Sequence, residues 1–241
     1  MPIKMVKAID STVLGKKSIN YIISIRYDII NRATVDFSTG GFSSPERCII
    51  WDMINNIKRE VDMLLENDEA YYIYMAVKNT EKIKGDIAEV GVYQGGSAKI
   101  ICAANNEKSL HLFDTFEGIP SLDAIDSVNF HEGQFACPLD VVKNYLSQYE
   151  KIFFYKGTFP DTSVPVIDKK FSFVHLDVDT YPSTLNCLKF FYPRMSQGGI
   201  IISHDYLVAG VRKAFDEFFV DKPDPIIELL SSQCLIVKTS R

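Results

Sequence analysis

A succession of short apolar runs limits the fold of this chain more than any other feature of its sequence. From residue 85 onward the runs alternate with stretches of helical spacing, and most end in glycine or aspartate: DIAEVGV, LHLFD, IFFYKG, FSFVHLDVD, GGIIISHD, IIELL and CLIVKT. Near-continuous apolar strands are typical of a parallel sheet that helices cover on both faces. The last two runs are separated only by SSQ and predict an antiparallel hairpin at one edge. We therefore expect an α/β fold with a doubly wound, mostly parallel, seven-stranded sheet of the Rossmann-like kind.

Residues 1–84 are expected to form an N-terminal helical extension, packed on a core domain of residues 85–241 within a single structural unit. The sequence SSPE resembles a helix start. The spacing that follows would place four apolar residues on one helix face: Ile49, Met53, Ile57 and Val61. Two interpretations remain open for this region, ordinary helical packing or a mobile lid over an active site.

The composition narrows the class of protein. The chain has 241 residues, 46% of them apolar, which suits one domain with a large core. A net charge of -5 without a polybasic run argues against nucleic acid as a partner, because phosphate binding needs clustered Lys and Arg. The five cysteines are dispersed, which indicates reduced thiols. No signal core or stretch of roughly 20 apolar residues is present. We expect a cytoplasmic protein that does not bind membranes.

The first apolar run ends in a glycine-rich turn, and the second ends in an acid, Asp114, followed by Thr115. The candidate cofactor-binding residues of the turn are Glu89, Gly91, Tyr93, Gly95 and Ser97. Glycines let the backbone approach a ligand closely, and an acid at the second strand end can accept hydrogen bonds from ribose hydroxyls. The spacing G-x-x-x-G-G differs from the nicotinamide fingerprint, and no phosphate-binding Lys follows it. With the strand order of class I methyltransferases, the pattern indicates S-adenosylmethionine, whose cationic methionine end suits Glu89. An ordinary tight turn is the simpler alternative.

Four charged side chains follow the fourth and fifth predicted strands: Asp177, Asp179, His204 and Asp205. If these strands are neighbours, the side chains converge at one end of the sheet. Three carboxylates in one place repel one another unless a cation or shared protons offset their charge. Mg²⁺ prefers such oxygen ligands and lowers the pKa of a bound hydroxyl, whose proton a nearby carboxylate can take. The alternative is that these acids cap the helices that follow, and that His204 pairs with one of them.

Six motifs in this order resemble the macrocin O-methyltransferase family: EVGVYQGGSA, LFDTFEGIP, YKGTFPDT, HLDVDTYPST, GGIIISHDY and GVRKAFDEFF. The resemblance covers roughly residues 85–238, and the combination of FDTFEG with LDxDxY is its most specific part. It implies an enzyme that transfers a methyl group from S-adenosylmethionine to a hydroxyl, on a sugar of a natural product or glycan, with the help of Mg²⁺. It also implies a glycosylated or hydroxylated small-molecule substrate and a homo-oligomer.

Carried over to this chain, the resemblance assigns the cofactor residues to parts of S-adenosylmethionine. Glu89, Gly91 and Ser97 with the adjoining turn would hold the methionine portion, and Asp114 would hold the ribose. The segment Gly157, Thr158 and Phe159 would border the adenine.

The resemblance assigns metal binding to Asp177 and Asp205, and catalysis to Asp177 and Asp179, with Asp179 as the general base. Many relatives carry two consecutive acids where this chain has His204 and Asp205. The third ligand is therefore open: His204 binds the metal, shifts the preference toward a softer ion, or does neither.

Two other functions stay open from the sequence. One is a related metal- or cofactor-dependent enzyme such as a cephalosporin-type hydroxylase, and the other is a non-catalytic protein that binds S-adenosylmethionine. The segment DAIDSVNFHEGQ, residues 123–134, resembles an insertion that shapes the acceptor pocket. Within it, His131 either touches the substrate or is an exposed loop residue.

Overall fold

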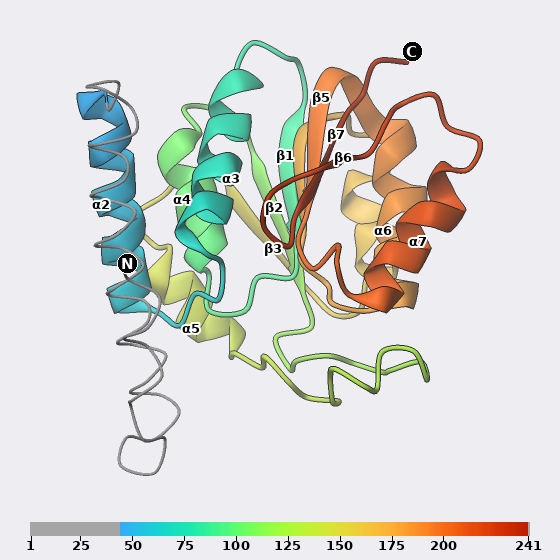
Figure 1. Cartoon of the computed structure of the whole chain (residues 1–241). Coiled ribbons are helices and arrows are strands. Elements are labelled where there is room, and N and C mark those ends of the chain that lie inside the picture. Colours follow the sequence, from blue (N-terminus) through green and yellow to red (C-terminus); the bar gives the residue numbers. More distant parts are fainter. Residues whose placement is uncertain (1–43, 241) are drawn as a thin grey trace, which may run out of the picture. The chain divides into compact units, whose positions relative to one another are not determined.

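The computed structural model describes residues 44–240, and its compact units are residues 1–50 and residues 51–241. The second unit holds the sheet and the helices that cover it (Figure 1). The described elements are, in order, α2 (Pro45–Glu60), α3 (Asn67–Asn79), β1 (Asp86–Val90), α4 (Gly96–Ala104), β2 (Leu110–Asp114), α5 (Leu139–Tyr145), β3 (Ile152–Lys156), η2 (Asp161–Val166), β4 (Phe171–Leu176), α6 (Tyr181–Phe191), η3 (Tyr192–Arg194), β5 (Met195–Ser203), α7 (Ala209–Phe219), β6 (Ile227–Glu228) and β7 (Cys234–Val237).

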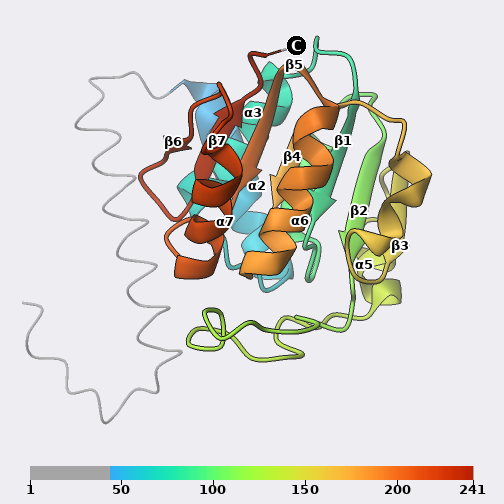
Figure 2. The same ribbon diagram turned by 90° about the vertical axis from the view of Figure 1, so that its right-hand side faces the viewer.

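The seven strands form one sheet in the order β3-β2-β1-β4-β5-β7-β6 (Figure 2). Strands β1 to β5 pair in parallel, whereas β7 runs antiparallel to both β5 and β6. The strand order reverses between β1 and β4, and in open sheets of this kind ligands bind beyond the carboxyl ends at that point. The structure confirms the expected α/β class and mostly parallel sheet, including the terminal hairpin.

Helices cover both faces of the sheet, with α3 and α4 on one side and α6 and α7 on the other (Figure 1). This explains the uninterrupted apolar runs, because a strand between two helical layers buries both of its faces. Every residue of β4 is buried. Between β4 and α6, the ring centroids of Phe171 and Phe191 lie 5.1 Å apart, and both side chains are fully buried. Each such side chain contributes about 1.5–3 kcal/mol to the stability of the core.

One prediction about α2 was wrong. Ile49 is 69% exposed, and the helix ends at Glu60, before Val61. The buried positions are Ile50, Ile54 and Ile57, whose spacing of four and three residues places them on one face. The spacing of apolar residues in the sequence is compatible with more than one buried face of α2, and only the packing of the folded chain determines which one is buried.

The role of residues 1–84 as a lid stays a prediction, and residues 1–43 lie outside the described part of the chain. Residues 51–84 belong to the same compact unit as the sheet. Among residues 44–240, none of the helices is both long and apolar enough to cross a bilayer.

Candidate active site

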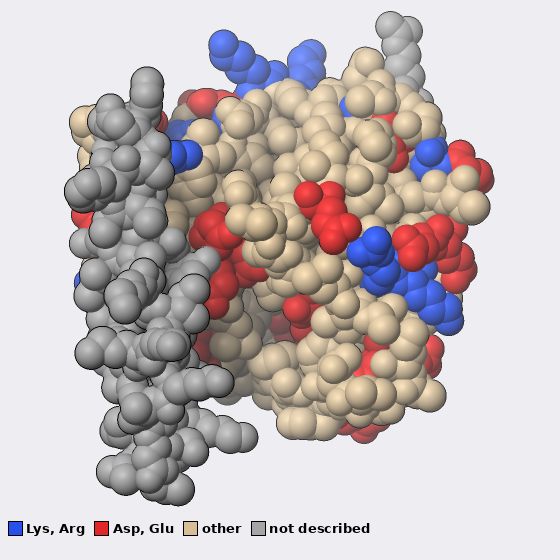
Figure 3. Space-filling model, in the orientation of Figure 1, with Lys and Arg blue, Asp and Glu red and all other residues tan. Residues whose placement is uncertain are grey.

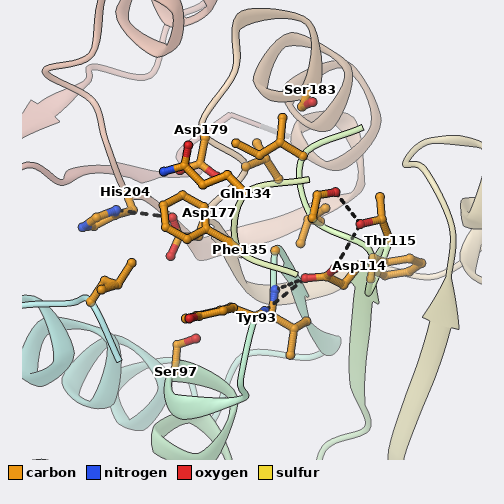
Figure 4. Close-up of a pocket in the computed structure, with 18 of the residues that line it drawn as sticks. Tyr93, Ser97, Asp114, Thr115, Gln134, Phe135, Asp177, Asp179, Ser183 and His204 are labelled. Atoms are coloured by element: carbon orange, nitrogen blue, oxygen red, sulfur yellow. Dashed lines mark hydrogen bonds and ion pairs between the residues drawn. The ribbon is translucent and has the colours of Figure 1, made fainter. Parts of the chain in front are cut away.

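The candidate site is a cavity of about 330 Å³ at the carboxyl ends of β1, β2, β4 and β5 (Figure 4). Its floor consists of residues at or just beyond the ends of these strands, including Gly91, Asp114, Asp177 and His204. Two further segments complete its walls, residues 62–65 before α3 and residues 118–135 after β2. The second of these segments lies across the carboxyl ends of the strands in both ribbon views (Figures 1 and 2).

Asp114 holds the glycine-rich turn in place through backbone hydrogen bonds. Its Oδ2 atom accepts the N–H groups of Val92 at 2.6 Å and Tyr93 at 3.1 Å, and its Oδ1 atom accepts that of Phe116 at 2.6 Å. The carboxylate still borders the cavity, as do Tyr93 and Thr115 (Figure 4). Asp114 therefore links the ends of β1 and β2, which face the same ligand space.

Gly91 is required where β1 meets β4. Its φ is +86°, and a Cβ atom there would lie 1.7 Å from the carbonyl oxygen of Asp177. No side chain fits at that distance, so only glycine allows the two strand ends to approach so closely. This contact joins the turn to the acidic cluster.

Most predicted cofactor residues line the cavity, but two do not. Gly91, Tyr93, Ser97, Asp114, Thr115, Gly157, Thr158 and Phe159 all border it. Gly95 instead lies at the N-cap of α4. Glu89 is fully buried, and its Oε1 atom lies 2.9 Å from His175 Nδ1. Burial raises the pKa of Glu89 despite this partner, and its Oε2 atom has no hydrogen-bond partner among the described residues.

The acidic cluster forms around His204. Its Nδ1 atom lies 3.3 Å from Asp177 Oδ1 and 3.4 Å from Asp205 Oδ1. Asp179 borders the cavity beside them. Figure 4 shows Asp177 and Asp179 on neighbouring parts of the same tail, with His204 reaching toward Asp177. The four residues that the sequence places at the ends of two strands therefore do meet.

The charges of this cluster depend on one another. Burial alone would raise the pKa of Asp177, but His204 outweighs it and lowers that pKa. Burial, together with the charges of Asp177 and Asp205, raises the pKa of Asp179 well above its usual range. Burial opposes protonation of His204, yet the surrounding carboxylates raise its pKa. Neighbouring acids with pKa values pushed apart are typical of sites where one acid exchanges protons and another stays ionised.

The backbone around the cavity is unusual. Four non-glycine residues that border it have a positive φ: Tyr93 (49°), Phe135 (62°), Asp179 (61°) and Asp205 (55°). Such conformations cost free energy and persist where the surrounding structure enforces them, which is common at functional sites. They aim two carboxylates and two aromatic rings into the same space. The rings of Tyr93 and Phe135 meet edge to face, with centroids 5.7 Å apart.

The donor set fits a divalent cation. Asp177, His204 and Asp205 each offer one ligand atom, and the three atoms lie within 4.8 Å of one another. Two carboxylate oxygens and one imidazole nitrogen suit Mg²⁺ less closely than an all-oxygen set, and suit Mn²⁺ or another transition ion well.

Sequence reasoning missed the segment between α2 and α3. Residues 62–65 line the cavity, and the backbone N–H of Asp62 donates to Gln94 Oε1 at 2.9 Å. The Tyr93 hydroxyl donates to the Asp62 carboxylate at 3.2 Å. Met63 packs directly on Gly96, at the start of α4. The sequence gives no signal for these contacts, because the segment carries no motif.

The loop of residues 119–134 contains the segment 123–134, for which a role in the acceptor pocket stays a prediction. The Ile119 N–H donates to the carbonyl of Gln134 at 2.9 Å and closes the neck of the loop. Farther along, the buried carboxylate of Asp126 accepts the Tyr181 N–H at 3.0 and 3.2 Å, at the first turn of α6. Phe130 and Gln134 border the cavity. His131 is an exposed loop residue and does not border the cavity.

Figure 3 shows how charge is distributed on one face of the molecule. Acidic side chains lie across the middle of the face, while Lys and Arg gather at its upper edge and right-hand side. On this face the described residues form no broad basic surface of the kind that binds a nucleic-acid backbone.

The sheet order and the cavity across its switch point define the class I methyltransferase fold. Within this class, the family model described as macrocin-O-methyltransferase (TylF) matches residues 72–228. The chain belongs to this family.

Two curated relatives match a little over half of the chain. The 8-demethyl-8-(2,3-dimethoxy-alpha-L-rhamnosyl)-tetracenomycin-C 4'-O-methyltransferase of Streptomyces olivaceus is 30% identical over 152 residues, 56% of this chain and 58% of the relative. The mycinamicin III 3''-O-methyltransferase of Micromonospora griseorubida is 29% identical over 154 residues, 56% of this chain and 61% of the relative. The matched region thus spans about three fifths of each relative's length. The solved structure of the O-methyltransferase NovP superimposes with a TM-score of 0.67 at 24% identity and covers 74% of this chain and 82% of that one.

Proposed function

We propose that this chain is an S-adenosylmethionine-dependent O-methyltransferase that acts on a hydroxyl group, on a sugar of a natural product or glycan, with a divalent cation at Asp177, His204 and Asp205. The observation that carries the proposal is the meeting of the two predicted constellations in one cavity of a macrocin-O-methyltransferase family member. The names of the matched relatives, one of which includes a rhamnosyl group, support a sugar hydroxyl as the acceptor.

The methyl donor would bind along the tails of β1, β2 and β3. Asp114 holds the turn with its backbone facing the cavity, so the ribose and methionine portions would meet a surface that is already ordered. Gly157 and Phe159 border the cavity beyond Asp114 and would flank the adenine. A preorganised surface lowers the entropy lost on binding.

The acceptor hydroxyl would lie between the donor and the acidic cluster. A bound divalent cation would lower the pKa of that hydroxyl. Asp179 borders the cavity beside the candidate ligands, and burial raises its pKa well above the usual range, which makes its carboxylate a stronger base for the hydroxyl proton. Asp177 and Asp205 would hold the cation, and their fixed positions would aim the hydroxyl at the methyl group. The loop of residues 119–134 would exclude water and contact the rest of the acceptor.

Calorimetric titration with S-adenosylhomocysteine, with and without Mg²⁺, tests this proposal first. We expect binding in both conditions and none with NADH. The protein is then incubated with S-adenosylmethionine, metal and each member of a panel of glycosylated acceptors. Mass spectrometry of the products identifies the substrate as the acceptor that gains the mass of one methyl group. If the folded protein binds no S-adenosylhomocysteine in either condition, the proposed function is wrong.

A further inference from the structure

The carboxylate of Glu69 lies against the face of His204 that is turned away from the cavity. Glu69 is the third residue of α3 and is 2% exposed. Its Oε2 atom lies 3.2 Å from His204 Nε2 and accepts the Glu66 N–H at 2.7 Å. Its Oε1 atom accepts the backbone N–H of Ser232 at 3.1 Å and the Ser232 hydroxyl at 2.8 Å. Four contacts therefore fix this carboxylate.

The fixed carboxylate decides which nitrogen of His204 faces the cluster. A carboxylate whose two oxygens meet N–H and O–H donors acts as an acceptor, so His204 Nε2 carries a proton and donates it to Glu69. The other ring nitrogen, Nδ1, is then the one that lies among Asp177 and Asp205, at 3.3 and 3.4 Å. A histidine that binds a metal commonly donates its remote N–H to a carboxylate, which fixes the ring and makes the ligating nitrogen more basic.

Glu69 lies outside the part of the chain that the family model matches, which begins at residue 72. The carboxylate and the imidazole come from segments 135 residues apart in sequence. A buried carboxylate therefore lies directly behind the imidazole of His204.

We propose that Glu69 is a positioning residue that holds His204 with Nδ1 toward the cation, so that this site has an imidazole ligand and prefers Mn²⁺ or a similar transition ion to Mg²⁺. The inference rests on the proposed function, since it takes the cation at Asp177 and Asp205 from it. An imidazole nitrogen binds first-row transition ions more strongly than Mg²⁺, which prefers oxygen ligands.

The test is Mn²⁺ binding followed by pulsed electron paramagnetic resonance, which detects a nitrogen atom coordinated to the ion. We expect a nitrogen signal in the wild-type protein and none in His204→Asp, which restores an all-oxygen set and shifts the preference toward Mg²⁺. Glu69→Gln keeps the side-chain size but removes the charge, and should weaken Mn²⁺ binding about 10- to 100-fold, as loss of an outer carboxylate does elsewhere. Ser232→Ala is the matched control, because it removes a hydrogen bond to the other oxygen of the same carboxylate and leaves the His204 contact.

Titration of each variant with S-adenosylhomocysteine separates this inference from the proposed function. Three outcomes would overturn the role of Glu69 and His204 but leave the proposed methyl transfer standing. The wild type binds Mn²⁺ without a nitrogen signal, or it binds no Mn²⁺, or Glu69→Gln binds Mn²⁺ as tightly as the wild type does. If Glu69→Gln does not fold, the comparison of His204→Asp with wild type still decides whether the histidine is a ligand. Loss of Mn²⁺ affinity in Ser232→Ala equal to that in Glu69→Gln would also overturn the inference, because it would show a general packing effect. Absence of S-adenosylhomocysteine binding by the wild type would refute the proposed function itself.

Discussion

The two halves of the cavity are built on different principles. On the β1–β2 side, Asp114 accepts three backbone N–H groups, and uncharged side chains such as Tyr93 and Ser97 also line the ligand space. On the β4–β5 side, the carboxylates of Glu69, Asp177 and Asp205 surround the imidazole of His204. The pKa of Asp179 is raised there, while that of Asp177 is lowered. The first half is already satisfied by hydrogen bonds and suits recognition of a constant cofactor. In the second half the neighbouring carboxylates repel one another, and a bound cation that also holds the substrate hydroxyl would reduce this repulsion.

We expect the largest loss of stability from a substitution at the contact between the two halves of the cavity. Gly91→Ala would push a Cβ atom into the Asp177 carbonyl and separate β1 from β4. We expect the free energy of unfolding to fall by at least about 3 kcal/mol, since a close-packed backbone cannot yield that far. Urea unfolding measures it.

Gly133→Ala is the matched control for that change. Its φ is +76°, also positive, but a Cβ atom there meets no atom within 4 Å. Backbone strain alone should cost about 1–2 kcal/mol. Equal losses in the two variants would show that the contact between the halves is unimportant.

Asp179→Asn should affect only the acidic half. Because an amide cannot take the hydroxyl proton, we expect kcat to fall about 10²- to 10⁴-fold. Affinity for S-adenosylhomocysteine should stay unchanged. Asp123→Asn, an exposed acid on the neighbouring loop, is the control for general charge effects. A parallel loss of cofactor affinity in Asp179→Asn would mean that the halves are not separate.

Asp114→Asn should affect mainly the cofactor half. The amide keeps the shape but has a single acceptor oxygen, so the backbone N–H groups that face its NH2 group lose their acceptor and those that face its oxygen keep weaker hydrogen bonds. Such bonds contribute about 1.5–3 kcal/mol each, so partial loss predicts a Kd for S-adenosylhomocysteine about 10- to 100-fold higher. Mn²⁺ affinity should change little, and calorimetry measures both. A larger effect on the metal than on the cofactor would contradict the assignment.

Asp224 lies outside both halves of the cavity, and its carboxylate accepts several hydrogen bonds that stabilise its ionised form. Burial would raise its pKa, but hydrogen bonds from Thr239 and Tyr192 outweigh burial and lower that pKa below its usual range. A lowered pKa in the folded state means that the stabilisation is complete above the unfolded pKa of about 3.9 and is lost as the pH falls further.

Asp224→Asn should therefore cost about 1–3 kcal/mol at neutral pH, the usual loss of hydrogen bonds to a charge. It should also flatten the decline of stability between about pH 4 and pH 2. Urea unfolding across this range measures both changes. An unchanged acid profile would show that this carboxylate is not ionised in the folded protein.

The sequence by itself determined the sheet and most of the cavity floor. Apolar runs of strand length, separated by helical spacing, leave few arrangements, and parallel strands bring their carboxyl ends to one edge. For this reason Asp114, Asp177 and His204 were found from their positions alone. The chemistry at each strand end is local, so residue type and spacing reveal it.

Only the tertiary structure determined which side chains surround the residues of the cavity floor. Glu89 pairs with His175, Glu69 contacts His204 from a helix 135 residues earlier, and Asp126 accepts a hydrogen bond from the first turn of α6. None of these partners has a sequence signal, because each contact joins segments that are distant along the chain. A carboxylate finds its partner through packing of whole elements. The sequence therefore predicts which residues lie at the ends of the strands, whereas the tertiary structure determines which side chains from distant segments contact them.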